Sequence, residues 1–327
     1  MTDKKTLIKA IFNRHQKQAF EKEFKIKPID LDINVDGYMK HVLLEKKQVY
    51  ILYRNHQFYN YSKNEIKVSE WLNCLSKTSV PKLIKKVTNK DISPYPILVT
   101  QKLEGELLSK VMQKISEKEL MKIFENIAKC IAEYHEQSII NPPKITKHKL
   151  SKNITKEEWL YYIVNSETHK TALDFAYNKI KKYLNTRNKK ETLSLWQKTL
   201  EPIIKLQPVL NHNDIHEAQI LITNKNKVSG ILDWGDAHMN NPVLEFNFNE
   251  WLGFDTKEFL IKHIYDIRKT MWNEYTKLRN IKTVKYENIK LLYSIRYALN
   301  TEKFTNEFSL TYQKFARENL EWLNNFK

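Results

Sequence analysis

The pattern of hydrophobic and polar positions divides the chain into an early part with strand character and a longer part with helix character. Apolar side chains recur at helical spacing over residues 7–20, which predicts one amphipathic helix. Two short β-prone runs, Val42–Leu44 and Val49–Tyr53, flank a polar turn and predict a hairpin. A second helix is expected over residues 63–75, with a buried side formed by Ile66, Trp71, Leu72 and Leu75.

The first part is expected to end after the apolar run 96–100, which predicts a buried strand that stops near Gln101. One β-rich interruption follows downstream, where the runs 220–222 and 228–232 predict another hairpin. The other patterned segments favour helices over residues 119–135, 156–164, 171–184, 257–278 and 287–326. We therefore expect an α+β fold, with a small sheet-containing lobe over 1–101 and a larger, mostly helical lobe over 102–327.

Composition narrows the class of protein without changing this outline. The chain has 327 residues and 41% hydrophobic content, enough for a sizeable core. Cys74 and Cys130 stand far apart, so neither a disulfide framework nor a thiolate zinc site is indicated. Residues 1–12 lack the unbroken apolar run of a signal peptide or membrane span. We expect a cytoplasmic protein that does not enter the membrane.

The formal net charge of +17 raises the question of a polyanionic partner. Lysines are spread along nearly every segment, often beside glutamates, so compositional bias accounts for the charge and nucleic-acid binding is disfavoured. The five glycines of the chain provide no GxGxxG loop. This excludes the dinucleotide-binding fingerprint and the glycine loop of ordinary protein kinases.

The most informative segment is residues 210–222, LNHNDIHEAQILI, followed by residues 230–237, GILDWGDA. These residues resemble the aminoglycoside phosphotransferase and choline kinase superfamily, whose catalytic loop follows the pattern HGDLHxxN. A metal-binding aspartate then opens a short DW or DFG-like motif in that family. The resemblance implies a protein-kinase-like bilobal fold and transfer of phosphate from ATP, or GTP, to a hydroxyl of a small molecule.

The family pattern assigns a role to each polar residue of the motif. Phosphoryl transfer needs a carboxylate that orients the acceptor hydroxyl and Mg²⁺ ligands that neutralise the triphosphate. The resemblance gives the first role to Asp214 and the metal to Gln219 and Asp233. His212 is expected to brace the loop by hydrogen bonding.

The resemblance extends upstream with less specific motifs. Residues 49–54 are similar to the third strand of the family's N-lobe, which implies that Arg54 contacts the α- and β-phosphates. Glu65 then corresponds to the glutamate that pairs with this cation. Backbone groups near Gln101 and Leu103 would bind adenine in the linker between the lobes.

The chain departs from the family pattern at four places. Gln219 replaces the usual Asn and lengthens the arm by one methylene, while Asn213 replaces Gly at a position expected near positive φ. Arg54 replaces a Lys with a bulkier cation of different geometry. Residues 240–245 stand where the family often has GDPxxD, a difference assigned to folding.

Two alternatives to an active kinase remain open. His212, His216 and His238 offer imidazoles for zinc, although their order differs from the standard HxHxDH pattern. A kinase-fold protein that binds nucleotide or regulates without turnover is motivated by Gln219 and the missing glycine loop.

The acceptor itself is also open between an antibiotic, an amino alcohol and a sugar-like metabolite, so a role in antibiotic resistance is one option among these. A polycationic acceptor would require a locally acidic lining, for which the sequence offers Asp255, Glu258 and Asp266. The sequence leaves the oligomeric state undetermined.

Overall fold

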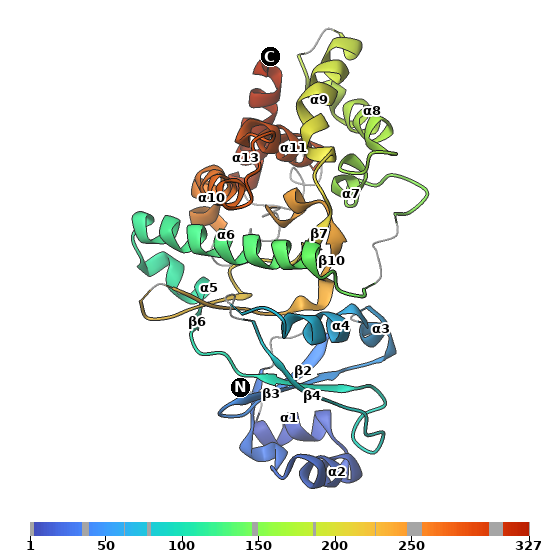
Figure 1. The fold of residues 1–327 in the computed structure, drawn as a ribbon, viewed down its shortest axis with the longest axis vertical. Helices are drawn as coiled ribbons and strands as arrows, with labels where there is room; N and C mark the ends of the chain where they lie inside the picture. The colour runs from blue at the N-terminus through green and yellow to red at the C-terminus, as the bar shows by residue number, and fades with distance from the viewer. Residues whose placement is uncertain are drawn as a thin grey trace. The chain divides into compact units, whose positions relative to one another are not determined.

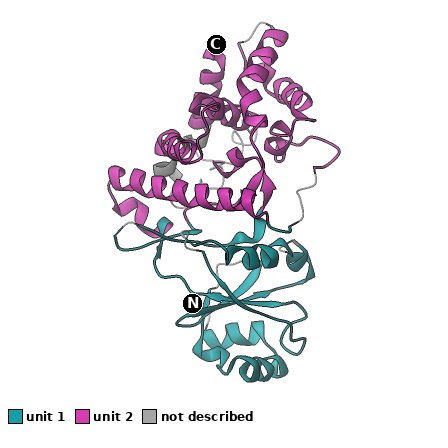
Figure 2. Ribbon diagram, in the orientation of Figure 1, with its two compact units in different colours: residues 1–108, 143–145, 218–237 teal, residues 109–142, 146–217, 238–327 magenta. Residues whose placement is uncertain are grey.

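The computed structural model describes residues 3–34, 39–61, 63–76, 80–145, 150–185, 188–225, 227–246, 257–300 and 310–326, with only the backbone described at 61, 257–262 and 310–313. The chain divides into two compact units (Figure 2). The first comprises residues 1–108, 143–145 and 218–237, and the second comprises 109–142, 146–217 and 238–327. The expected boundary after residue 101 differs from this division, which adds 102–108, 143–145 and 218–237 to the first unit.

The first unit is built on a five-stranded antiparallel sheet (Figure 1). Its strand order is β1-β2-β3-β5-β4, with bounds Asp32–Asn34, Lys40–Leu44, Gln48–Tyr53, Ile97–Gln101 and Leu83–Val87. The hairpin β2–β3 and the buried strand β5 confirm the sequence predictions. The strands β1 and β4 were not anticipated, because β1 has three residues and β4 carries two exposed lysines in place of an apolar run.

The predicted single helix over residues 7–20 is wrong, because the chain forms two helices there, α1 (Lys4–Ile11) and α2 (Arg14–Phe24). Asn13 separates them as an N-cap. Its side chain accepts the Gln16 N–H at 2.9 Å, and the Gln16 side chain accepts the Asn13 N–H at 2.9 Å. This capping box starts a new helix within a continuous apolar pattern.

Two further helices cover part of this unit, α3 (His56–Tyr61) and α4 (Lys63–Leu72). The expected buried side of the second one is confirmed for Ile66, Trp71 and Leu72; Leu75 is also buried, but it lies beyond Leu72, where the helix predicted over 63–75 ends. Glu65 on the same helix is also buried, at 4% exposure. A buried carboxylate needs a compensating hydrogen-bond or charge partner.

A small sheet completes the first unit, with strand order β6-β8-β9 and bounds Glu106–Leu107, Ile220–Ile222 and Val228–Ile231. The pair β8–β9 confirms the second predicted hairpin. Gly105, just before β6, has φ +132°, and a Cβ there would lie 2.8 Å from the Ile222 carbonyl oxygen. Only glycine therefore allows the chain to turn this closely against β8.

The second unit is mostly helical, as expected. The helices from α5 on are α5 (Leu108–Val111), α6 (Glu117–Ile140), α7 (Trp159–Ile163), α8 (His169–Ile180), α9 (Lys189–Ile204), α10 (Lys257–Leu278), α11 (Tyr286–Leu299) and α13 (Leu310–Asn325). The helix α9 was not anticipated, although Trp196, Leu200 and Ile203 are buried at helical spacing. The segment 287–326, predicted as one helical stretch, contains α11 and α13.

The core of the second unit lies around α6. This helix packs against α10 and against the two-stranded ribbon of β7 (Val209–Asn211) and β10 (His238–Asn240) (Figure 1). Its buried side extends over its whole length, from Leu120 to Ser138. Among the described helices, none combines the length and apolar content that a membrane crossing requires.

Candidate active site

The loop that carries Asp214 begins directly after β7. Asn213 adopts φ 66°, which confirms the expectation of positive φ at this position. An asparagine tolerates this backbone better than most residues. Asp214 is half-buried, with a side chain 31% exposed, and its carboxylate lies 3.8 Å from His216 Nε2. Asp214 is thus presented on a sharp turn and remains accessible.

His212 braces this loop, as predicted. The residue is fully buried, and its ring Nδ1 accepts the N–H of Asp214 at 3.3 Å. Its own backbone N–H donates to Glu245 Oε2 at 2.7 Å. Both ends of the turn are therefore held by groups within the core of the second unit.

Glu245 is the centre of a buried polar network. His135 of α6 lies 3.4 Å from Glu245 Oε2 through Nε2, and its Nδ1 lies 3.0 Å from the Tyr275 hydroxyl. Because an ionised carboxylate only accepts, His135 Nε2–H is the donor to Glu245 and Nδ1 accepts from Tyr275. The network ties α6 and α10 to the loop that carries Asp214.

The charges of this network follow from burial and hydrogen bonding. Burial lowers the pKa of His135, and the nearby Glu245 carboxylate opposes this without reversing it. Burial alone would raise the pKa of Glu245, but hydrogen bonds from His135 and from the His212 N–H lower it. Both lowered pKa values agree with a neutral His135 beside an ionised Glu245.

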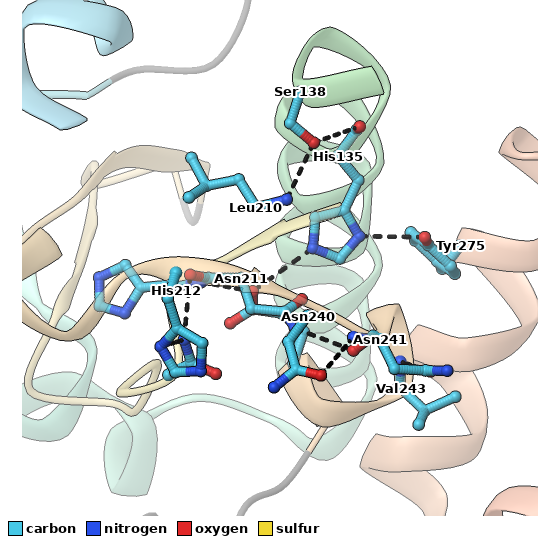
Figure 3. A network of polar contacts seen from close by, with 12 residues as sticks. His135, Ser138, Leu210, Asn211, His212, Asn240, Asn241, Val243 and Tyr275 are labelled. Atoms are coloured by element: carbon cyan, nitrogen blue, oxygen red, sulfur yellow. Dashed lines mark hydrogen bonds and ion pairs between the residues drawn. The ribbon is translucent and has the colours of Figure 1, made fainter. Parts of the chain in front are cut away.

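Residues 240–245 support the loop, in line with the folding role expected for this segment. The Asn211 side chain donates to the Asn241 carbonyl at 2.8 Å, and the Asn241 side chain donates to the Ile203 carbonyl at 2.8 Å (Figure 3). The Asn241 amide oxygen accepts the Val243 N–H at 3.1 Å. The two strands of the ribbon and the end of α9 are locked together by these bonds.

A second polar cluster lies in the first unit and contains Asp233. This residue adopts a left-handed backbone, with φ 58°, directly after β9. Lys40 Nζ lies 2.6 Å from the Asp233 carboxylate and 2.9 Å from that of Glu65. The Tyr53 hydroxyl donates to the other oxygen of Glu65 at 2.8 Å. We call these four residues the Lys40 cluster.

Lys40 is protonated within this cluster. Burial would lower the pKa of Lys40, but the charges and hydrogen bonds of Glu65 and Asp233 raise it above its ordinary value. Burial and the Glu65 carboxylate raise the pKa of Tyr53, so its hydroxyl stays protonated and donates. Lys40 is therefore a buried ammonium group held between two carboxylates.

The structure corrects one pairing expected from the sequence. Glu65 was matched with Arg54, but its two carboxylate oxygens are engaged by Lys40 and Tyr53. Arg54 lies one residue beyond the end of β3 and is exposed. In the sequence, Lys40 is a single lysine just before a β-prone run, and nothing local marks it as a partner of Glu65. Only the strand register, which places Lys40 opposite Tyr53, brings it to that carboxylate.

Gln101 and Leu103 lie at the end of β5 and in the linker that follows. The Gln101 N–H donates to the Lys82 carbonyl at 2.8 Å, so this residue offers a base its carbonyl group rather than its N–H. A hollow of about 680 Å³ adjoins both residues and extends to Gly105. Their role in adenine binding remains a prediction.

Gln219 and Asp233 have suitable chemistry for Mg²⁺. Both present oxygen atoms, and Asp233 keeps a side chain that is 34% exposed while it contacts Lys40. Mg²⁺ is commonly bound by one or two protein oxygens together with substrate phosphates. Within the described residues no group of three or more His, Cys, Asp or Glu is arranged to hold a metal. Gln219 and Asp233 would therefore suit a magnesium ion whose other ligands come from a nucleotide.

The acidic residues considered for an acceptor are only partly described. Asp255 lies outside the described residues, and only the backbone of Glu258 is described. Asp266 is exposed on α10.

The antiparallel sheet of the first unit, the helical second unit and the aspartate-bearing loop define a kinase-like α+β protein. The model of the phosphotransferase enzyme family matches residues 30–249, more than half of the chain. The chain belongs to this family.

Solved structures show the same fold. The GDP complex of a wild-type aminoglycoside 2'-phosphotransferase-IIIa matches with a TM-score of 0.55 and 16% identity, over 95% of this chain and 98% of that one. An ADP-bound aminoglycoside phosphotransferase APH(2'')-Ib matches with a TM-score of 0.51 and 16% identity, over 96% of this chain and 97% of that one. A macrolide 2'-phosphotransferase from Brachybacterium faecium matches with a TM-score of 0.50 and 11% identity, over 93% of this chain and 97% of that one.

Among curated proteins, the clavilactone A biosynthesis cluster protein Y of Ampulloclitocybe clavipes is 23% identical over 217 residues. The match covers 59% of this chain and 53% of that protein, so the chain spans about half the length of this relative. This relative leaves the substrate open.

Proposed function

We propose that this protein transfers the terminal phosphate of ATP or GTP to a hydroxyl group of a small molecule. The observation that carries the proposal is the Lys40 cluster, a buried ammonium group held by Glu65 beside Asp233. Such a charge is costly to bury and is stabilised here by two carboxylates. A phosphate group is the natural ligand for this cation once nucleotide is present.

Lys40, rather than Arg54, is proposed to contact the phosphates. Glu65 and Tyr53 fix the position of the Lys40 ammonium group, which then needs no reorganisation when phosphate binds. Arg54 is exposed and is proposed to contact only outlying phosphate oxygens. Gln101 and Leu103 are proposed to receive the base through backbone groups.

Asp233 and Gln219 are proposed to hold Mg²⁺, which when bound neutralises charge on the phosphates. Lys40 contacts Asp233 at 2.6 Å and so fixes the orientation of this carboxylate. Gln219 accepts the Leu232 N–H at 2.8 Å through its backbone, which couples its position to the strand that leads into Asp233. The longer Gln arm keeps the oxygen donor that Asn would supply.

Asp214 is proposed to accept the proton of the acceptor hydroxyl. The His212 ring and the buried Glu245 hold the turn, so the carboxylate is presented by a rigid loop. Positioning of the hydroxyl by a fixed carboxylate is a main contribution of the protein in this type of reaction.

The acceptor class is proposed from the family rather than from a bound ligand. Related solved structures include aminoglycoside and macrolide phosphotransferases, so a hydroxylated antibiotic or a metabolite of similar size is the proposed acceptor. A role in antibiotic resistance would follow if the acceptor is an antibiotic. An ATP-consuming reaction agrees with the cytoplasmic location expected from the sequence.

Replacing Asp214 tests the proposal directly. Phosphate transfer from ATP or GTP is measured against hydroxylated antibiotics, choline-like amines and sugars. Asp214→Asn is expected to lower transfer at least about 100-fold while nucleotide still binds. Asp174→Asn, at an exposed position of α8, serves as the matched control and should leave transfer unchanged. Transfer at the original rate by Asp214→Asn would show that the assignment is wrong.

A further inference from the structure

The second unit contains a pocket of about 450 Å³. Its walls come from the α7 region, from the segment between α9 and β7, and from β10, represented by Tyr161, Leu206 and Met239. A volume of several hundred Å³ is typical of sites for small organic molecules.

Two side-chain contacts join this pocket to the catalytic loop. The Tyr161 ring lines the pocket and lies 5.5 Å from the His238 ring, at an interplanar angle of 37°. His238 Nδ1 lies 2.7 Å from the Asn213 side-chain nitrogen, so Asn213 donates to it. Asn213 immediately precedes Asp214. A short chain of contacts therefore connects the wall of the pocket to the proposed base, Asp214.

Among the described residues, the lining contains no lysine or arginine, which is unusual for a protein with a net charge of +17. Its only carboxylate belongs to Glu167, whose N–H donates to the Asn165 side chain at 2.9 Å. The apolar part of the lining consists of Leu150, Val164, Ile204, Leu206, Pro208 and Met239. The Asn165 and Asn240 side chains contribute amide groups, whereas the Asn241 amide is already bonded to Ile203 and Val243.

We propose that this pocket binds the body of the acceptor, and that the acceptor is a hydroxylated amine with an apolar body and a single positive charge. The inference rests on the proposed phosphotransfer and specifies its substrate class. An anionic acceptor would meet Glu167 and, among the described lining residues, no lysine or arginine. A polyamine with little apolar surface would find one carboxylate for several charges and would leave the apolar walls unused.

Binding measured without nucleotide tests this inference separately from phosphotransfer. Three probes are titrated calorimetrically: propranolol, a hydroxylated monoamine with an aromatic body; propranolol glycol, the uncharged diol with the same body; and kanamycin, a polyamine. The protein is expected to prefer propranolol over both others. Glu167→Gln should weaken propranolol about threefold and leave the glycol unchanged. Glu157→Gln, an exposed position outside the lining, is the matched control.

Two further variants test the location. Met239→Trp fills the pocket and should weaken both aromatic probes at least about tenfold. Leu206→Lys adds a cation and should weaken propranolol more than the glycol. Both positions are partly exposed, so folding is expected to persist.

The outcomes separate the two proposals. Asp214→Asn is expected to bind propranolol like the original protein, even though transfer is lost. Loss of transfer in every assay with the probe preference intact would overturn the proposed function alone. Tighter binding of kanamycin, affinities unaffected by Met239→Trp and Leu206→Lys, or no binding of any probe at millimolar concentration would overturn the pocket assignment.

Discussion

At the residue scale, the position of the buried cation distinguishes this chain. Lys40 on β2 stands directly opposite Tyr53 on β3, and both side chains reach the carboxylate of Glu65. The ammonium group thus comes from the strand beside the one on which the sequence placed the cation. Neighbouring strands lie about 4.8 Å apart, a separation that a lysine side chain spans.

Lys40→Met is expected to lower phosphate transfer at least about 100-fold, because the buried cation proposed to contact the phosphates is removed. The variant should also be less stable, by about 3 kcal/mol or more, since Glu65 loses the partner of a buried charge. Steady-state rates and urea unfolding measure the two effects. Arg54→Met provides the comparison and should lower both quantities far less than Lys40→Met, because Arg54 is exposed and is proposed to contact only outlying phosphate oxygens. A larger loss in Arg54→Met would restore the role first expected for Arg54.

Tyr53→Lys in the Lys40→Met background is expected to recover part of the lost activity. The register pairs the two positions, so a lysine at position 53 begins beside the same Glu65 carboxylate. Tyr53→Lys in the original protein places two ammonium groups together and should lower stability instead. Absence of any recovery in the double variant would indicate that the cation is required on β2 itself.

At the scale of elements, the Asp214 loop depends on α6 and on the segment after β10. The Ser138 hydroxyl accepts the Leu210 N–H at 2.9 Å and donates to the His135 carbonyl at 2.7 Å, so β7 is held against α6 (Figure 3). Glu245 binds the backbone of His212. The rigidity of the loop is thus set by residues distant from it in sequence.

Acidification should destabilise this arrangement. Burial lowers the pKa of His135 below its ordinary 6.5, so below that pH the unfolded chain takes up a proton that the folded protein does not. The lowered pKa of Glu245 likewise reduces the free energy of unfolding as the pH falls further. The free energy of unfolding is therefore expected to fall between pH 7.5 and 5.5, by at most about 1.4 kcal/mol per pH unit for each histidine.

Urea unfolding at several pH values measures this slope, and His135→Gln is expected to make it shallower. Burial also lowers the pKa of His41 and His169, which remain in the variant and preserve the rest of the slope. Slopes are compared because the substitution also changes stability at every pH. An unchanged slope would show that His135 titrates alike in the folded and unfolded states.

At the scale of the whole molecule, nucleotide binding is the property that separates an active kinase from a protein that only shares the fold. ATP or GTP with Mg²⁺ is expected to raise the melting temperature, because a ligand that binds only the folded state stabilises it by about 2.7 kcal/mol at 100 times its Kd. Thermal unfolding with each nucleotide, with and without EDTA, measures the rise. Asp233→Asn should remove most of its dependence on Mg²⁺. No response to either nucleotide would favour a regulatory protein without turnover.

The sequence alone determined the elements whose signals are local. The hairpins β2–β3 and β8–β9, the strand β5 and the helix α10 follow from hydrophobic period and turn residues. The family also followed from the sequence, because the catalytic motif is a contiguous run of residues. The positive φ of Asn213 and the bracing by His212 are properties of this run.

Only the tertiary structure decided which side chains meet. The break between α1 and α2 depends on an N-cap that the apolar pattern conceals, and the partner of Glu65 depends on the register between two strands. The Lys40 cluster joins positions 40, 65 and 233, and the loop is held by positions 135 and 245. Contacts across such separations are fixed by strand register and helix packing, and no local pattern of residues encodes them.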